Sequence, residues 1–250
     1  MTADTHCKHQ TTAPHAAAFR IEGCVCRVDG FKWHYVEDRR LAIDLHWAQA
    51  TAANPAYFDG IVLLTSACRL DPVNAPPSRI ELTLFETRFR NFLYWRHHGF
   101  AGEGVVDAFG VAIVRARDGA ILLVRQRPGN VNEGPYNLPS GFIDRSDVDE
   151  DGRVDLAANI SREVEEEIGL GAGELTRRPG YIVTRVGVHL AVGVEYRSDL
   201  ASDDLAALIR AFLSADENPE IAEIIFVHKR EHFEGLDLAP HCRQILDALL

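Results

Sequence analysis

The sequence lacks a long apolar run and an excess of basic residues. None of its 250 residues lies in an unbroken apolar segment of the ~20 residues that a membrane-spanning helix needs. Residues 1–18 are polar and lack the apolar centre of a signal peptide. Lys and Arg together number 26 against 37 Asp and Glu, a net charge of −11, so little positive charge is left to neutralise a nucleic-acid backbone. We therefore expect a cytoplasmic protein that neither spans a membrane nor binds nucleic acid.

Cysteine is scarce and its positions are irregular. The five cysteines, at 7, 24, 26, 68 and 242, are odd in number and scattered, which does not indicate a disulfide framework. Cys24 and Cys26, with Cys7 and His9, have the composition of a zinc site. The alternation around them is more typical of small residues in a buried strand. We expect reduced thiols and no zinc.

The chain divides into three parts. Residues 1–18 are predicted to be a flexible tail, 19–100 an N-terminal α/β extension, and 101–250 the main domain. Apolar periodicity predicts strands at 19–28, 61–68, 80–85, 105–114, 121–124, 181–196 and 221–227, and helices at 36–52, 86–98, 156–168, 205–213 and 240–250. Within the helix at 86–98, core packing is the favoured interpretation of the aromatic residues, and Arg88, Arg90 and Arg96 are secondary candidates for phosphate contact.

Three glutamates form the most informative pattern in the chain. Glu163, Glu166 and Glu167 are spaced i, i+3 and i+4, so on a helix they share one face. A solvated acidic face is the simple alternative. Like charges on adjacent turns repel one another, however, and a hard divalent cation such as Mg²⁺ would bring them together. The residues around these glutamates favour a metal site over a solvated acidic face.

The segment 162–170, Arg-Glu-Val-Glu-Glu-Glu-Ile-Gly-Leu, matches every specified position in the second half of the Nudix box. Upstream, Leu138-Pro139-Ser140-Gly141 resembles the loop that opens the box. The chain thus resembles the Nudix hydrolase superfamily. This resemblance implies an α/β fold, an α/β/α sandwich with a mixed sheet, over residues 101–250, preceded by the small α/β extension.

The box differs from the family pattern in two ways. The family's opening Gly stands fourteen residues before the Arg, whereas Gly141 stands twenty-one before Arg162, so seven residues are added. The family's Glu eight residues before the Arg is replaced by Val154. Asp155 is placed to cap a helix over 156–168, and Gly169 is placed to end it in a left-handed conformation. We interpret the departure as a lengthened loop before an intact catalytic helix.

The resemblance implies metal-assisted hydrolysis of a nucleoside diphosphate linked to another group. Mg²⁺ is the implied cofactor, with Mn²⁺ as a substitute, and Arg162 would orient a glutamate of the box. Glu220 is a candidate general base, although a solvated Glu beside a turn is the commoner case. The implied metal ligands are Gly141, Glu163, Glu166 and Glu167, and the implied catalytic set is Arg162, Glu163, Glu166 and Glu220. Candidate substrate contacts are Arg125, Arg127 and Tyr136, for which surface charge and a loop anchor are equally open roles.

The extension, the turn at 54–60 and the lengthened box together resemble a UDP-sugar-cleaving branch of the family. We therefore expect hydrolysis of a nucleotide sugar to a nucleoside monophosphate and a sugar phosphate. ADP-ribose or a dinucleotide is the alternative substrate. A catalytically inactive nucleotide-sensing or interaction module is the alternative from another class. The expected partner is a small nucleotide-type substrate, and a homodimer is left open.

Overall fold

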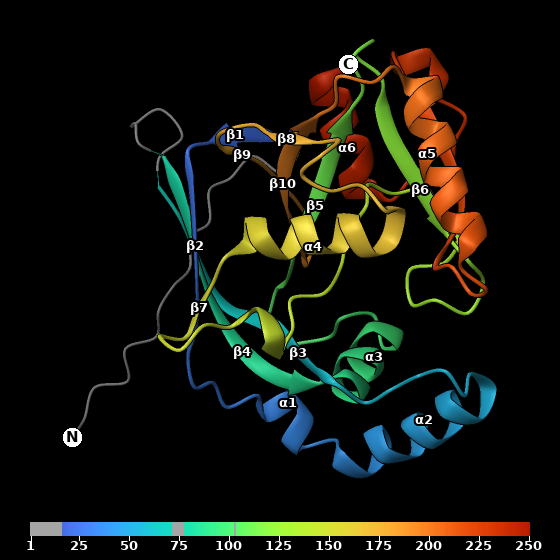
Figure 1. Ribbon diagram of the computed structural model, residues 1–250. Helices are drawn as coiled ribbons and strands as arrows, with labels where there is room; N and C mark the ends of the chain where they lie inside the picture. The colour runs from blue at the N-terminus through green and yellow to red at the C-terminus, as the bar shows by residue number, and fades with distance from the viewer. Residues whose placement is uncertain (1–16, 72–77, 103) are drawn as a thin grey trace.

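The computed structural model describes residues 17–71, 78–102 and 104–250, which form two mixed β-sheets with helices against them (Figure 1). The larger sheet has the strand order β1-β9-β10-β5-β6-β11, with β8 beside β10. Its strands are β1 (Phe19–Ile21), β5 (Asp107–Arg115), β6 (Ile121–Gln126), β8 (Thr176–Arg177), β9 (Tyr181–Val186), β10 (His189–Arg197) and β11 (Ile221–Val227). The smaller sheet has the order β3-β4-β2-β7, with β2 (Gly23–Val28), β3 (Ile61–Leu70), β4 (Arg79–Arg88) and β7 (Arg153–Val154).

The larger sheet lies between two helical layers. Helices α4 (Leu156–Ile168) and α5 (Ser202–Ala215) cover one face, and α6 (Pro240–Leu249) covers the other. Side chains alternate along a strand, so in β6 Leu122 packs in the core under α4, and Leu123 packs in the core under α6. The predicted α/β/α sandwich with a mixed sheet is therefore confirmed.

The smaller sheet carries the helices of the N-terminal segment, α1 (His34–Glu37), α2 (Arg40–Ala53) and α3 (Phe89–His97). The predicted helix at 36–52 is in fact α1 and α2, because the chain turns at 38–39. A third core of Leu64, Phe85, Phe92 and Trp95 joins these helices to the sheet, and Phe142 from the main domain packs against it. The aromatic residues of α3 are thus core residues, as favoured.

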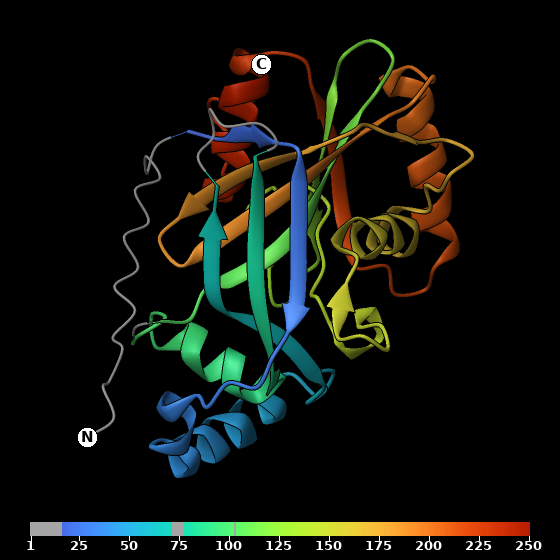
Figure 2. The ribbon, with the colours of Figure 1, turned by 90° about the vertical axis from the view of Figure 1, so that its left-hand side faces the viewer.

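Each sheet includes one strand from the other part of the chain (Figure 2). The predicted strand at 19–28 is interrupted at Glu22, and its first part, β1, pairs antiparallel with β9 of the larger sheet. In return β7, which follows the lengthened loop of the main domain, pairs antiparallel with β2 of the smaller sheet. The division of the chain at residue 100 remains a prediction, and these pairings tie its two sides together.

The predicted strand at 181–196 is a hairpin, because the chain turns at 187–188, where Gly187 has φ 60°. Along β10, the bulky residues Leu190, Val192 and Val194 pack in the core under α4. The sparsely filled face lies on the α6 side. Helix α4 therefore packs against the bulky face of β10 and not against the sparse one.

Close contact between β5 and α4 leaves no room for a side chain at Gly110. A Cβ on Gly110 would lie 2.4 Å from Cγ1 of Ile160, a buried residue of α4. We expect Gly110→Ala to lower the free energy of unfolding by about 1–3 kcal/mol through overpacking. Urea denaturation measures this change. The control is Gly173→Ala, whose new Cβ would meet nothing within 4 Å, and an equal loss in both variants would contradict the explanation.

Candidate functional site

Helix α4 begins and ends where its sequence predicts. Its N-cap Asp155 accepts hydrogen bonds from the backbone N–H groups of Ala157 at 3.0 Å and Ala158 at 3.1 Å. Gly169 ends the helix in the left-handed conformation, with φ 70°. Val164 and Ile168 are buried in the core, so the opposite face presents the glutamates. The predicted bounds 156–168 are confirmed.

The turn at Ser140–Gly141 lies directly against this acidic face. A Cβ on Gly141 would lie 1.9 Å from the carboxyl carbon of Glu163, so only glycine lets the turn approach this closely. The backbone N–H of Ser140 donates a hydrogen bond to the carboxylate of Glu167. The added residues in the loop therefore do not separate the two halves of the box.

Two of the glutamates are poorly compensated in this position. Burial raises the pKa of Glu163 to about 7, against the lowering effect of Arg162. Burial, followed by the charges of Glu220 and Glu163, raises the pKa of Glu167 to about 8. One carboxylate oxygen of Glu167, Oε2, is buried without a hydrogen-bond partner. A buried carboxylate with a raised pKa has too little positive charge around it, and a divalent cation would provide that charge.

The third glutamate points elsewhere. The side chain of Glu166 is 61% exposed and pairs with Arg162, with 2.8 Å between Oε2 and Nη1. As the side chains stand, no three His, Cys, Asp or Glu residues in the described part of the chain are grouped to hold a metal ion. The structure therefore brings together Gly141, Glu163 and Glu167, and leaves Glu166 at the edge of the group.

Sequence reasoning missed Asp147. Its side chain is only 6% exposed, and Arg162 Nη2 lies 3.1 Å from its Oδ1, while Asn159 donates to Oδ2 at 2.9 Å. Val154 does stand eight residues before the Arg, but in the folded protein an acidic residue from earlier in the loop, Asp147, contacts Arg162. In the family spacing that acidic residue follows the Gly by six positions, and six positions after Gly141 is Asp147. Counting back from Arg162 led to Val154, because the extra residues lie after Asp147.

The predicted substrate contacts Arg125 and Tyr136 bind each other. The Arg125 guanidinium lies over the Tyr136 ring, 5.0 Å from its centroid, and also pairs with Glu223. Burial and a hydrogen bond to Glu223 raise the pKa of Tyr136. Arg127 is exposed, and its backbone N–H donates to the carbonyl of Glu220 at 2.8 Å. In this structure these three residues therefore support loops, and their contact with substrate remains a prediction.

Glu220 lies at the start of β11, near the acidic face. Loss of hydration, followed by the charge of Glu166, raises the pKa of Glu220. Its carbonyl accepts hydrogen bonds from the loop 127–135, including one from Asn130 Nδ2 at 3.1 Å. Its backbone is thus held in place by the loop 127–135.

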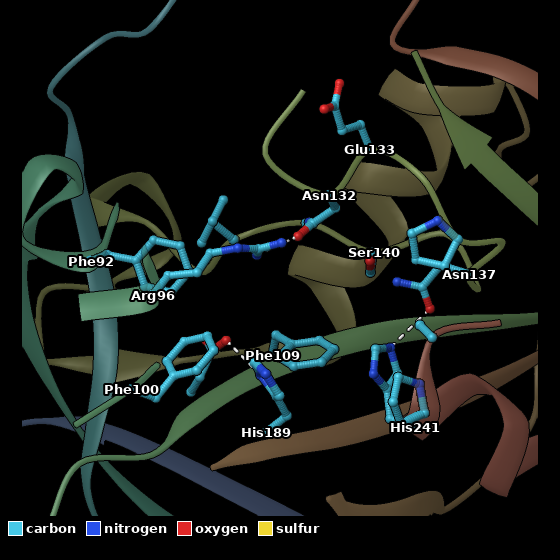
Figure 3. A pocket seen from close by; sticks show the side chains of 16 residues that line it. Phe92, Arg96, Phe100, Phe109, Asn132, Glu133, Asn137, Ser140, His189 and His241 are labelled. Carbon is cyan, nitrogen blue, oxygen red and sulfur yellow. Dashed lines mark hydrogen bonds and ion pairs between the residues drawn. The ribbon is translucent and has the colours of Figure 1, made fainter. Parts of the chain in front are cut away.

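A cavity of about 230 Å³ opens beside the Ser140–Gly141 turn (Figure 3). Its lining includes Arg96 from α3 and His189 from β10, whose Nδ1 lies 3.0 Å from Asp107 Oδ2. Arg88 and Arg90, by contrast, form ion pairs with Asp59 on the surface. Only one of the three secondary arginine candidates therefore reaches the cavity. Aromatic rings fill much of the remaining wall, namely Phe92, Phe100, Phe109 and Phe142.

The model of the NUDIX domain matches residues 105–235, which is more than half of the chain. The chain belongs to the Nudix family. It is accordingly a pyrophosphohydrolase of that family. Members of the family generally use a divalent metal ion, and the poorly compensated carboxylates of α4 fit such an ion.

Solved Nudix structures resemble the chain at low identity. The MutT protein from Methanosarcina mazei Go1 is 17% identical, with a TM-score of 0.40 over 58% of this chain and 92% of that chain. The NUDIX domain of Shewanella oneidensis NrtR, complexed with ADP ribose, is 18% identical, with a TM-score of 0.37 over 60% and 88%. A Nudix hydrolase from M. smegmatis, RenU, is 20% identical, with a TM-score of 0.38 over 57% and 81%. A comparison with curated protein sequences finds no match.

Helices long and apolar enough to cross a bilayer are absent from the described parts of this Nudix protein. Its four described cysteines, Cys24, Cys26, Cys68 and Cys242, are free thiols, whereas Cys7 and His9 lie outside the described residues.

The raised pKa values predict how the stability of the metal-free protein depends on pH. Unfolded glutamate titrates near ~4.3, so Glu163 and Glu167 stabilise the fold below that pH. Their contribution is lost as the pH rises through about 7 and about 8. We expect the melting temperature of chelator-treated protein to fall between pH 5 and 9. The melting temperature of Glu167→Gln should fall less over this pH range. An equal fall in the variant and the wild type would contradict the raised pKa of Glu167.

Proposed function

We propose that this Nudix protein hydrolyses a nucleotide sugar in a Mg²⁺-dependent reaction, giving a nucleoside monophosphate and a sugar phosphate. The observation that carries the proposal is the pair of carboxylates held against the Ser140–Gly141 turn, half-buried Glu163 and buried Glu167, of which Glu167 keeps one oxygen without a partner. Mn²⁺ is expected to substitute. A cytoplasmic location and a homodimer remain predictions.

The residues that would hold the cation are Glu163, Glu167, Glu166 and the carbonyl of Gly141. Their oxygen donors suit a hard cation, and the unpartnered Oε2 of Glu167 offers a free ligand atom. When bound, the cation supplies positive charge against the charge that develops on the phosphate oxygens. Glu166 lies three residues after Glu163 on the same helix face, and it would have to turn away from Arg162 to join this group.

The remaining steps fall to the chain's own side chains. Arg162 lies 2.9 Å from Glu163 Oε1 and holds that carboxylate in place. Glu220 is the proposed general base, because its raised pKa brings it closer to the range in which a carboxylate accepts a proton from water near neutral pH. Its backbone is held by hydrogen bonds from Arg127 and Asn130, which positions the side chain for that role.

The nucleotide sugar is favoured over ADP-ribose by the N-terminal segment. This segment resembles the UDP-sugar-cleaving branch in sequence, and it supplies one wall of the cavity through Phe92, Arg96 and Phe100. The alternative of an inactive sensing module rested on a missing acidic residue and a disruptive insertion. Asp147 lies beside Arg162, and the turn contacts Glu163 despite the added residues, and both observations support turnover over an inactive module.

Removing a metal-binding carboxylate should stop turnover. We expect Glu166→Gln and Glu167→Gln each to lower kcat by about 100-fold or more, because the cation loses an anionic ligand. Glu165→Gln is the matched control, since Glu165 is exposed on the same helix outside the acidic face. Assays over UDP-sugars, ADP-ribose and dinucleotides with Mg²⁺ measure this, and near-normal activity in both variants would exclude the proposed site.

Asp147 should act as a positioning residue through Arg162. Asp147→Asn removes the charge that holds the guanidinium, and we expect a 10–100-fold loss in kcat with little change in KM. Asp147→Glu should recover part of the loss, because it restores the carboxylate. Thermal melting checks that both variants fold. If Asp147→Glu is as impaired as Asp147→Asn, the charge is not what matters.

A further inference from the structure

The cavity beside the Ser140–Gly141 turn contains an arginine that has no carboxylate partner among the described residues. Nη1 of Arg96 donates to Oδ1 of Asn132 at 2.8 Å, and the other guanidinium N–H groups have no hydrogen-bond acceptor in the described structure. Arg90, on the same helix, differs sharply. Its guanidinium forms ion pairs with Asp44 at 3.0 Å and with Asp59 at 2.7 Å. Of these two arginines, Arg96 is the one without a carboxylate partner among the described residues, so its charge is available to a ligand.

The carboxylates near Arg96 are already engaged. Asp107 pairs with His189, and Glu133 accepts a hydrogen bond from the backbone N–H of Gly129. Arg96 itself is half-buried beside Phe92. A cation in such surroundings is best satisfied by an oxyanion that binds the guanidinium through two oxygens.

The opposite end of the cavity is polar but uncharged. Oδ1 of Asn137 accepts from the backbone N–H of Leu138 at 2.9 Å, so it also accepts from His241 Nε2, which lies 2.9 Å away. Burial, followed by the charge of His189, lowers the pKa of His241 to about 4. His241 is therefore neutral, with Nδ1 as an acceptor, while the Asn137 amide keeps its N–H donors. Figure 3 shows this pair and the Arg96–Asn132 pair on opposite sides of the cavity.

We propose that this cavity binds the sugar phosphate half of the substrate, with Arg96 and Asn132 as an oxyanion subsite and Asn137 and His241 against the sugar hydroxyls. The choice of ligand rests on the proposed function. Ser140 and Gly141 line the cavity and also contact the glutamates of α4. The bound half and the cleaved bond can therefore belong to one molecule.

The size of the cavity agrees with a partial substrate. Its volume of about 230 Å³ lies below the ~300–1,000 Å³ of sites that enclose a drug-sized ligand. A single substituted ring with its phosphate suits this space better than a whole nucleotide sugar. The N-terminal segment therefore selects the leaving half of the substrate through Arg96.

Product binding tests the subsite without turnover. Calorimetric titration with glucose 1-phosphate in the presence of Mg²⁺ should show affinity at least tenfold weaker for Arg96→Gln than for wild type. Arg90→Gln is the matched control and should bind as wild type does. Asn132→Asp keeps the arginine and places a competing carboxylate beside it, so it should show the same loss. Thermal melting verifies that each variant is folded.

Kinetics identify which oxyanion Arg96 binds. In Arg96→Gln, an equal rise in KM for UDP-glucose and UDP-glucuronate assigns the phosphate, whereas a rise for UDP-glucuronate alone assigns a sugar carboxylate. The subsite is overturned if Arg96→Gln and Asn132→Asp match wild type with every ligand, or if Arg90→Gln loses as much affinity. Arg96-dependent binding of glucose 1-phosphate without hydrolysis of any nucleotide sugar would instead reject the proposed function alone.

Discussion

The contact between the Ser140–Gly141 turn and the carboxylates of α4 is the constraint on which the site depends. It excludes water from Glu163 and Glu167, so both carboxyl groups hold protons at pH values where exposed glutamates have lost them. The contact needs a glycine, a helix with a defined start, and a core that presses α4 onto the sheet. The electrostatic property of the site thus follows from backbone packing.

Arg162 connects this contact to the lengthened loop. Its guanidinium bridges Asp147, Glu163 and Glu166, so one cation balances three anions at the helix surface. In the metal-free state the arginine is the only partner that Glu166 has among the described residues. A divalent ion would compete with Arg162 for that carboxylate, and Asp147 would keep the arginine in place as Glu166 is released.

Local patterns predicted much of the fold. The bounds of α4 and β11 were predictable because capping residues and apolar periodicity act within a few residues. The hairpin at Gly187 was missed because alternation continued through the turn. Asp147 was missed because the position was counted back from Arg162, and the added residues lie between the two. The cavity was out of reach, since its walls come from segments as far apart as Arg96 and His241.

The added residues of the box have a structural consequence. They carry Val154 into the smaller sheet, where it pairs with Cys26. In the sequence these residues interrupt the Nudix box. In the structure they lead into β7, which pairs with the N-terminal segment whose Arg96 lines the cavity. The strand that follows the insertion thus forms one edge of the smaller sheet and pairs the main domain with the N-terminal segment.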